Sequence, residues 1–573
     1  MLFQKLAKAF EKIESKSGRL EMTELLGELF REASPEEAER IAYIVEGELL
    51  PPYMGVDMGL GEKFVLQAVS EGSGYSRKEV EEKFAALGDL GAVAEKLLSG
   101  KKQQSLHAQE LTVAYVYAAL MKIAKASGRG SQEEKIKRLV ELYNNANPLE
   151  AKYITRFVLG QLRLGVGGPT ILDALSFSER GDKSLREELD RAYNLCSDIG
   201  YVARKFKENP HGMGEFKIEV FKPIMPALAE RLASAEEIVK KLGRCGVEQK
   251  YDGFRMAIHK KGGRVEIFSR RLERITPSFP DVVKEVEKLP ASEIIFEGEA
   301  LAFNEKERKF YSFQETMHRR RKYGVEEASR KYPLHVYVFD LHYLNGEDWT
   351  GKTYAERRKM LEKIFPKGNL KLSEMEVVDS AEGLQELFDK ALEMRLEGII
   401  AKDLNAPYTA GKRKFAWIKL KKSYGKAMDT VDALIVGYYR GKGARAEFGF
   451  GGLLVAVYNE NKERFETIAK VGSGFTEEEM GKFAEDLGKM RTNNAPANLD
   501  YKIEPDFWVK PKMVVEIAYD NITKSPVHTC GEEKGKGFAL RFPRLVRLRD
   551  DKGPYDVTTT REIREMYKEE GGQ

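Results

Sequence analysis

The residues best suited to do chemistry lie in the stretch Glu248-Gln249-Lys250-Tyr251-Asp252-Gly253-Phe254-Arg255. Asp252-Gly253 predicts a tight turn, because glycine tolerates positive φ and aspartate can bond its own backbone. Lys250 then ends one strand, and a second strand runs from Phe254 to His259. A lysine held on rigid backbone becomes a nucleophile when burial or a neighbouring cation, here Arg255, favours its neutral form. The alternative for Lys-x-Asp-Gly alone is a surface hairpin with a solvated lysine.

Further along the chain, several predicted strands carry residues that could join Lys250. They are Arg270 after the Gly262-Gly263 turn, Glu297 and Glu299 on one face of a strand, Phe339 in an apolar strand, Glu397 beside another, and Lys419 and Lys421 on one face of a third. Each has a simpler interpretation alone, as an edge carboxylate, a solvated basic strand or a core aromatic. Together they supply a nucleophile, carboxylates for Mg²⁺, cations for phosphates and a flat ring for a base, which nucleotidyl transfer needs.

The order of these segments resembles the covalent nucleotidyltransferases, and specifically the archaeal/eukaryotic-type ATP-dependent DNA ligases. The resemblance covers nearly the whole chain, including the helical first third and the basic segment 541–552. It implies that Lys250 carries AMP covalently and that Lys552 orients the leaving pyrophosphate. It further implies adenine recognition by Glu248 with Phe339 stacked on the base, ribose contacts from Arg255 and Glu299, phosphate contacts from Arg270, Arg413 and Lys419 with Lys421 nearby, and metal linkage of Glu299 and Glu397.

Three domains are expected. Residues 1–215 read as an all-α DNA-binding domain, 216–425 as an α+β nucleotidyltransferase (adenylation) domain, and 426–573 as a strand-rich domain that the family implies to be a β-barrel OB-fold. Helix starts are predicted where a capping side chain stands three residues before Glu, namely at Ser34, Ser76, Ser131 and Asn147. We expect the last domain to move about a hinge near residues 425–430, and the final helix from Thr560 to be ordinary packing.

Two glycine-rich joints in the helical third, 55–63 and 163–170, could meet DNA phosphates with free backbone N–H groups. Lys152, Arg156 and Arg163 could line a basic face at the second joint. The alternative is interhelical turns beside a solvated basic face. The segment Gln103-Gln104-Ser105-Leu106 is similar to sliding-clamp-binding peptides, with a plain loop as its alternative.

Composition sets further bounds. The 573 residues include 42% hydrophobic side chains and carry a net charge of +4, which neither requires nor excludes nucleic acid. The three cysteines lie far apart, which suits a reducing cytoplasm, and no apolar run is long enough to cross a membrane. We therefore expect a cytoplasmic monomer that uses ATP and Mg²⁺ on nicked double-stranded DNA, with a sliding clamp as a candidate partner.

Rival functions share parts of this pattern. An RNA ligase or an mRNA-capping guanylyltransferase has the same lysine chemistry, but the long helical first domain argues against both. An NAD-dependent ligase is disfavoured because three scattered cysteines are too few for that family's zinc module. A non-catalytic DNA-clamping protein is disfavoured by the coexistence of Glu299, Glu397, Lys419 and Lys552.

Overall fold

The computed structural model describes residues 1–16, 18–100, 110–232, 234–311, 313–321, 323–365, 369–394, 396–421, 429–441 and 449–570. These residues form two compact units: unit 1 comprises 1–193 and 197–216, and unit 2 comprises 194–196 and 217–573. The clamp-like segment 103–106 and residues 425–428 of the expected hinge lie outside the described residues. None of the helices within the described ranges has the length and apolarity needed to cross a membrane. All three cysteines are buried as free thiols.

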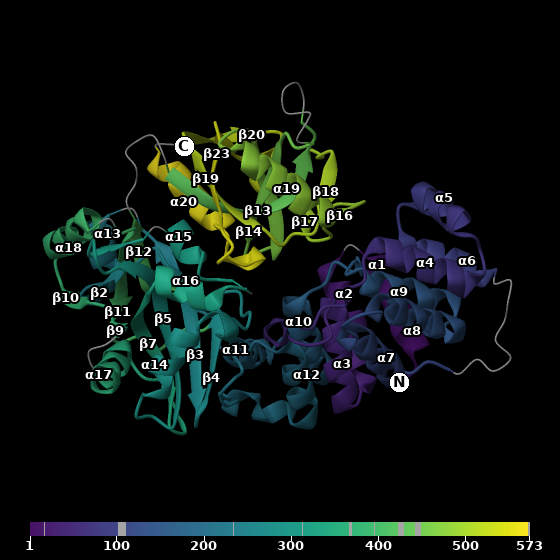
Figure 1. Cartoon of the computed structure of the whole chain (residues 1–573), viewed down its shortest axis with the longest axis horizontal. Coiled ribbons are helices and arrows are strands. Elements are labelled where there is room, and N and C mark those ends of the chain that lie inside the picture. Colours follow the sequence, from purple (N-terminus) through teal and green to yellow (C-terminus); the bar gives the residue numbers. More distant parts are fainter. Residues whose placement is uncertain are drawn as a thin grey trace. The chain divides into compact units, whose positions relative to one another are not determined.

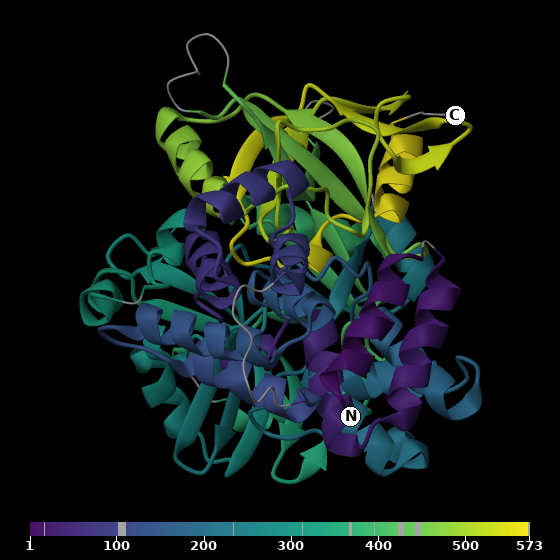
Figure 2. The same ribbon diagram turned by 90° about the vertical axis from the view of Figure 1, so that its right-hand side faces the viewer.

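Unit 1 is built of helices, as its heptad-like apolar spacing predicts (Figures 1 and 2). The first helix buries Phe3, Leu6, Phe10 and Ile13 on one face. The helices are α1 (Phe3–Glu14), α2 (Arg19–Glu32), α3 (Pro35–Glu46), α4 (Glu62–Ser73), α5 (Arg77–Leu87), α6 (Leu90–Ser99), α7 (Val113–Lys125), α8 (Ser131–Asn145), α9 (Pro148–Val158), α10 (Gly168–Arg180), α11 (Arg186–Cys196) and α12 (Ile199–Glu208).

Three of the four predicted helix starts are capped as expected. Ser34, Ser76 and Asn147 each accept the backbone N–H of a glutamate three residues on, and that glutamate accepts the cap's own N–H. The prediction at Ser131 is wrong, because Ser131 is already the first residue of α8. The cap there is Gly130 at φ 82°, a left-handed conformation that glycine adopts without a Cβ clash.

The basic face predicted from Lys152, Arg156 and Arg163 is an ion-pair network inside unit 1. The guanidinium of Arg156 is 4% exposed, and it donates to Asp89 Oδ2 at 2.5 Å and to Glu14 Oε2 at 2.8 Å. Lys152 also lies 3.3 Å from Glu14, and Arg163 lies 3.5 Å from Asp89. Arg156 therefore joins α9 to α1 and to the start of α6, and it is not a solvated cation.

Unit 2 begins with two sheets, which we call together the central region (217–421). The five-stranded sheet has the order β1-β12-β11-β2-β10, and the other sheet has the order β4-β3-β5-β7-β8 with β6 on β5 and β9 on β7. The strands of the first are β1 (Leu228–Arg231), β2 (Cys245–Lys250), β10 (Met375–Val378), β11 (Gly398–Asp403) and β12 (Arg413–Lys421). Those of the second are β3 (Phe254–Lys261), β4 (Arg264–Ser269), β5 (Glu293–Asn304), β6 (Lys309–Phe310), β7 (Leu334–Leu344), β8 (Glu347–Asp348) and β9 (Leu370–Leu372).

Each sheet of the central region has its own apolar core. Ile238 of α13 (Ala235–Leu242) and Leu384 of α18 (Ala381–Glu393) belong to the core of the five-stranded sheet. Val282 of α14 (Pro280–Glu287) and Leu361 of α17 (Tyr354–Ile364) belong to the core of the second sheet. Two short helices, α15 (Phe313–Met317) and α16 (Val325–Lys331), complete the region.

The turn at Asp252-Gly253 is where the chain crosses from one sheet to the other, since β2 belongs to the first and β3 to the second. A Cβ on Gly253 would lie 2.4 Å from the carbonyl oxygen of Ala300, so the turn needs glycine for its close approach to β5. Lys250, the last residue of β2, is thereby fixed between the two sheets, as the sequence predicts.

Residues 429–441 and 449–570, which we call the carboxy-terminal region, are strand-rich as predicted. Their larger sheet has the order β16-β18-β13-β14-β15-β17, with β19 between β13 and β23, and a smaller sheet has the order β20-β22-β21. The strands are β13 (Asp429–Tyr439), β14 (Gly452–Asn459), β15 (Arg464–Val471), β16 (Arg491–Thr492), β17 (Leu499–Asp500), β18 (Phe507–Val509), β19 (Val514–Tyr519), β20 (Asn521–Ser525), β21 (Cys530–Glu533), β22 (Lys536–Arg541) and β23 (Arg544–Leu548), with helices α19 (Glu477–Lys489) and α20 (Thr560–Glu569).

Gly398, at the start of β11, gives a test of this packing. Its φ is +147°, and a Cβ there would lie 2.1 Å from the carbonyl oxygen of Leu420 on β12. We expect Gly398→Ala to destabilise the protein by about 2 kcal/mol or more, because it adds both strain and a clash. Thermal unfolding followed by circular dichroism measures the loss. Gly263→Ala is the control, since its Cβ meets open space; equal midpoints for the two variants would contradict the packing.

Candidate active site

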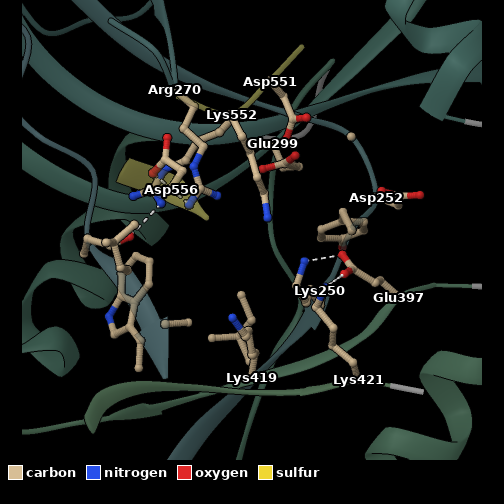
Figure 3. A pocket seen from close by; sticks show the side chains of 18 of the residues that line it. Lys250, Asp252, Arg270, Glu299, Glu397, Lys419, Lys421, Asp551, Lys552 and Asp556 are labelled. Atoms are coloured by element: carbon tan, nitrogen blue, oxygen red, sulfur yellow. Dashed lines mark hydrogen bonds and ion pairs between the residues drawn. The ribbon is translucent and has the colours of Figure 1, made fainter. Parts of the chain in front are cut away.

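A pocket opens beside the end of β2, between the central region and the carboxy-terminal region (Figure 3). Its lining includes nine of the ten residues predicted from the sequence. These are Glu248, Lys250, Arg255, Arg270, Glu299, Phe339, Glu397, Lys419 and Lys552. The tenth, Arg413, begins β12, but its side chain lies outside the described part of the chain. Residues from 248 to 552 in the sequence therefore meet around one space.

At the centre of the pocket, the Lys250 ammonium donates to the carboxylate of Glu397, which also pairs with Lys421 (Figure 3). Strand pairing explains this arrangement, because Gly398 of β11 lies opposite Lys250 of β2 on one side and opposite Lys421 of β12 on the other. Burial alone raises the pKa of a carboxyl group, but the two ammonium groups outweigh it and hold the pKa of Glu397 well below its usual range.

Arg255 pairs with Glu297 rather than standing beside Lys250 as a free cation. Its Nε and Nη2 atoms donate to the two Glu297 oxygens at 2.9 and 2.6 Å, and the Tyr408 hydroxyl donates to the same carboxylate at 2.8 Å. The guanidinium also lies 5.3 Å from the ring centre of Phe339 and 5.6 Å from that of Trp417. Arg255 thus braces the aromatic side of the pocket.

Glu299, two residues beyond Glu297 on β5, faces the pocket and has no hydrogen-bond or ion-pair partner among the described residues. Burial raises its pKa to about 8, although the charges of Lys250 and Arg255 oppose the shift. A desolvated carboxylate without a partner fits a hard cation. Within the described ranges no group of three or more His, Cys, Asp or Glu residues could hold a metal ion, so any such ion would need ligands from elsewhere.

Glu248 lies beneath the pocket with 3% of its surface exposed. Its carboxylate accepts a hydrogen bond from the Tyr354 hydroxyl, lies 2.8 Å from Lys402 Nζ and lies 3.6 Å from Arg358. An ionised carboxylate has about four acceptor sites, so three neighbours leave capacity for a ligand. The sequence placed Glu248 here but assigned no role to Lys402.

The carboxy-terminal region supplies a second group of charges to the pocket. Lys552 pairs with Asp432, and Arg549 donates to Asp551 at 2.7 Å and to Asp432 at 3.2 Å. Burial, with the nearby charge of Arg549, lowers the pKa of Lys552 to about 8. Lys552 therefore reaches the pocket as the sequence predicts, and its counterion comes from its own region.

Three contacts join the carboxy-terminal region to the predicted nucleotide residues. They are Arg547 with Asp252 at 3.2 Å, Arg270 with Asp556 at 3.2 Å, and Lys419 with Glu562 at 3.4 Å. Glu562 also receives the caps of α20 from Thr559, so the final helix does more than pack. The sequence missed Asp432, Asp556 and Glu562; the only local signal was Asp432, a lone carboxylate in the apolar strand 431–436.

Family models match most of the chain in three consecutive parts. "DNA ligase N terminus" matches residues 2–176, "ATP dependent DNA ligase domain" matches 226–421, and "ATP dependent DNA ligase C terminal region" matches 446–552. These parts describe a nucleotide-dependent ligase with a helical first portion. The chain belongs to the ATP-dependent DNA ligase family, whose general function is the sealing of nicks in DNA.

Individual relatives agree with this assignment. A "Probable DNA ligase" of Dictyoglomus turgidum is 46% identical over 574 residues, covering 99% of this chain and 98% of that one. A "DNA ligase 2" of Thermofilum pendens is 44% identical over 581 residues, covering 98% of this chain and 96% of that one. A solved "mycobacterial DNA ligase D complexed with ATP and MES" is 24% identical, with a TM-score of 0.35 over 58% of this chain and 97% of that chain.

Proposed function

We propose that this chain seals nicks in duplex DNA through a covalent AMP on Lys250, in replication, repair and recombination. The amine of Lys250 attacks the α-phosphorus of ATP, forming an N–P bond while pyrophosphate leaves. AMP then passes to the 5′-phosphate at the nick, releasing the lysine. The 3′-hydroxyl finally attacks that phosphate, and AMP leaves. The observation that carries the proposal is the position of Lys250, whose nitrogen points into a pocket lined by Arg270, Lys419, Lys421 and Lys552 (Figure 3).

The charges of the pocket suit this chemistry. A triphosphate needs several cations, and preorganised cations stabilise the negative charge that grows on a leaving pyrophosphate. Lys250 must lose a proton before it attacks, and the Glu397 carboxylate that accepts its hydrogen bond lies in place to orient the amine. We assign Arg270, Arg413 and Lys419 to the nucleotide phosphates and Lys552 to the pyrophosphate.

We assign the remaining predicted residues to the nucleoside. Glu248 meets the adenine and Phe339 stacks on it, which agrees with a buried acceptor and a braced ring in the same pocket. Arg255 and Glu299 serve the ribose. Because Arg255 is bound to Glu297 and to the carbonyl of Ala227, its contribution includes holding the base-binding wall in place.

Mg²⁺ is the proposed cofactor. Mg²⁺ in phosphoryl-transfer sites keeps several waters and takes only one or two carboxylates, with substrate phosphates as its other ligands. A site with unpartnered Glu299 and no larger cluster in the described residues fits that pattern. Glu299 and Glu397 would hold the ion, and the ion would neutralise phosphate charge during transfer.

The finer architecture belongs to the same proposal. We propose residues 1–215 as the DNA-binding domain, 216–425 as the adenylation domain and 426–573 as an OB-fold domain that moves between steps. The chain would act as a monomer on nicked duplex DNA. A sliding clamp is a further proposed partner through residues 103–106, outside the described part of the chain.

Lys250→Ala tests the reaction directly. With radiolabelled ATP and Mg²⁺, the unaltered chain should gain one AMP on the peptide containing Lys250, and the variant should gain none, because no other amine holds that position. Lys261→Ala, at the exposed end of β3, is the control and should label normally. Labelling of Lys250→Ala would refute the assignment. A chain that binds nicked DNA but never labels would instead be a non-catalytic DNA-clamping protein.

The helical unit should grip DNA mainly through backbone phosphates, since it holds N-terminal helix ends at glycine joints and lies apart from the proposed catalytic set. We expect DNA affinity to fall steeply with salt, with a log–log slope of roughly −0.9 for each phosphate neutralised. A shortened chain beginning at Phe216 should still form lysyl-AMP but seal nicks poorly. Binding titrations and sealing assays at two salt concentrations measure both effects; full sealing by the shortened chain argues against this role.

Lys552→Ala should separate the first step from the last. A cation opposite the attacking amine stabilises pyrophosphate only while it leaves, so formation of lysyl-AMP should slow by about 100-fold. Sealing of a nick that already carries 5′-AMP should change far less. Lys536→Ala, exposed on β22 of the same region, is the control for folding. Equal losses in the two assays would mean that Lys552 supports folding or DNA binding instead.

A further inference from the structure

Lys402, on β11, is a buried lysine to which neither the sequence pattern nor the proposed reaction gives a role. Only 1% of its surface is exposed. Its Nζ atom lies 2.8 Å from Glu248 Oε2 and donates to the carbonyl oxygen of Phe339 at 3.2 Å. A lysine is almost never buried so fully unless it is paired, because an unpaired ammonium loses its hydration without compensation. The burial of Lys402 therefore depends on Glu248.

Aromatic rings enclose the same ammonium. Its nitrogen lies 4.4 Å from the ring centre of Trp417, 4.5 Å from that of Tyr354 and 5.0 Å from that of Phe339. These distances are within cation–π range, and the attraction is stronger where water is excluded. Phe339 and Trp417 also line the pocket. Lys402 thus holds the carboxylate and the aromatic wall in one arrangement.

The neighbours of Lys402 keep it charged and in place. Burial lowers its pKa, while the carboxylates of Glu248 and Asp340 oppose that shift. Asp340 is itself paired with Arg357 at 2.6 Å, and both side chains are fully buried. Strand register fixes the geometry, since Ile400 of β11 lies opposite Glu248 of β2. The pair of Lys402 and Glu248 is therefore built into the sheet and is not a surface contact.

We propose that Lys402 is a positioning residue that sets the base preference of the pocket by holding Glu248 as a fixed, ionised hydrogen-bond acceptor. An ionised carboxylate can only accept. It suits a purine that presents an amino group at position 6, as adenine does, and it repels a purine with a carbonyl oxygen there, as in guanine or hypoxanthine. This inference rests on the proposed function, in which Glu248 meets the base.

Removal of the ammonium predicts a change in selectivity rather than a uniform loss. Without Lys402, the Glu248 carboxylate would be buried beside one hydroxyl and a more distant guanidinium, and its neutral form becomes more favourable. A neutral carboxyl group carries an O–H donor, which can pair with a carbonyl at position 6. The site should then accept inosine triphosphate better relative to ATP.

The experiment compares ATP with inosine triphosphate as donors of the nucleotide to Lys250. The rates are measured as kcat/KM by mass of the modified peptide, with Mg²⁺ present, for the full chain. We expect the ratio favouring ATP to fall by about ten-fold in Lys402→Met, the size expected for one charge-assisted hydrogen bond. Lys260→Met is the matched control, since Lys260 is 5% exposed on β3 and donates only to the carbonyls of Glu287 and Leu289; its ratio should equal that of the unaltered chain.

Two more variants separate positioning from general damage. Tyr354→Phe keeps the ring and removes the hydroxyl that donates to Glu248, so it should lower the ratio in the same direction by a smaller factor, and it replaces Lys402→Met if that variant does not fold. In a Glu248→Gln background, adding Lys402→Met should change the ratio by less than about two-fold, because residues that act through one another are not additive.

The outcomes divide cleanly. If Lys402→Met and Tyr354→Phe lose activity with both nucleotides but keep the original ratio, Lys402 is only structural and the inference is overturned. An undiminished effect of Lys402→Met in the Glu248→Gln background overturns it as well. If the unaltered chain forms no lysyl-AMP from ATP, the proposed function fails first, and that result is distinguishable because it precedes any comparison of variants.

Discussion

Charge burial is the constraint on which the pocket depends. Each carboxylate beneath it is held by a buried or half-buried cation: Glu248 by Lys402, Glu297 by Arg255, Glu397 by Lys250 and Lys421, and Asp432 by Lys552. An isolated charge in such a place costs several kcal/mol, so no member of a pair can move far without the other. The sheets supply the positions, and the pairs fix the orientations of the side chains that face the ligand space.

The pairs differ in what happens if the central and carboxy-terminal regions separate. Lys552 and Asp432 both belong to the carboxy-terminal region, so they can move together without exposing an unpaired buried charge. Arg547 with Asp252, Arg270 with Asp556 and Lys419 with Glu562 each join the two regions, and separation breaks them. The Asp252 side chain is already 40% exposed, so water can replace its partner at little cost. The contacts between regions are thus of the kind that can be exchanged, while those within a region are not.

Local features of the fold could be predicted because neighbouring residues determine them. The strand–turn–strand around Lys250 follows from Asp252-Gly253, and the shared face of Lys419 and Lys421 follows from the period of a strand. The misplaced cap at Ser131 shows the limit of such rules, since a glycine one position earlier takes the cap instead. Pairing across long separations could not be read at all. Arg156 was expected in solvent but is enclosed by Asp89 and Glu14, which lie 67 and 142 residues away in the chain.

Glu297 and Glu299 show why a role does not follow from a pattern. They are two residues apart on β5 and were predicted to share a face, yet only the first has a cation of its own. Arg255 holds the pKa of Glu297 well below its usual range despite full burial, whereas burial raises the pKa of Glu299 to about 8. Two carboxylates with opposite shifts in one site have different tasks. Glu297 completes a structural pair under the aromatic wall, and Glu299 keeps an unsatisfied demand for positive charge that a substrate-borne cation can meet.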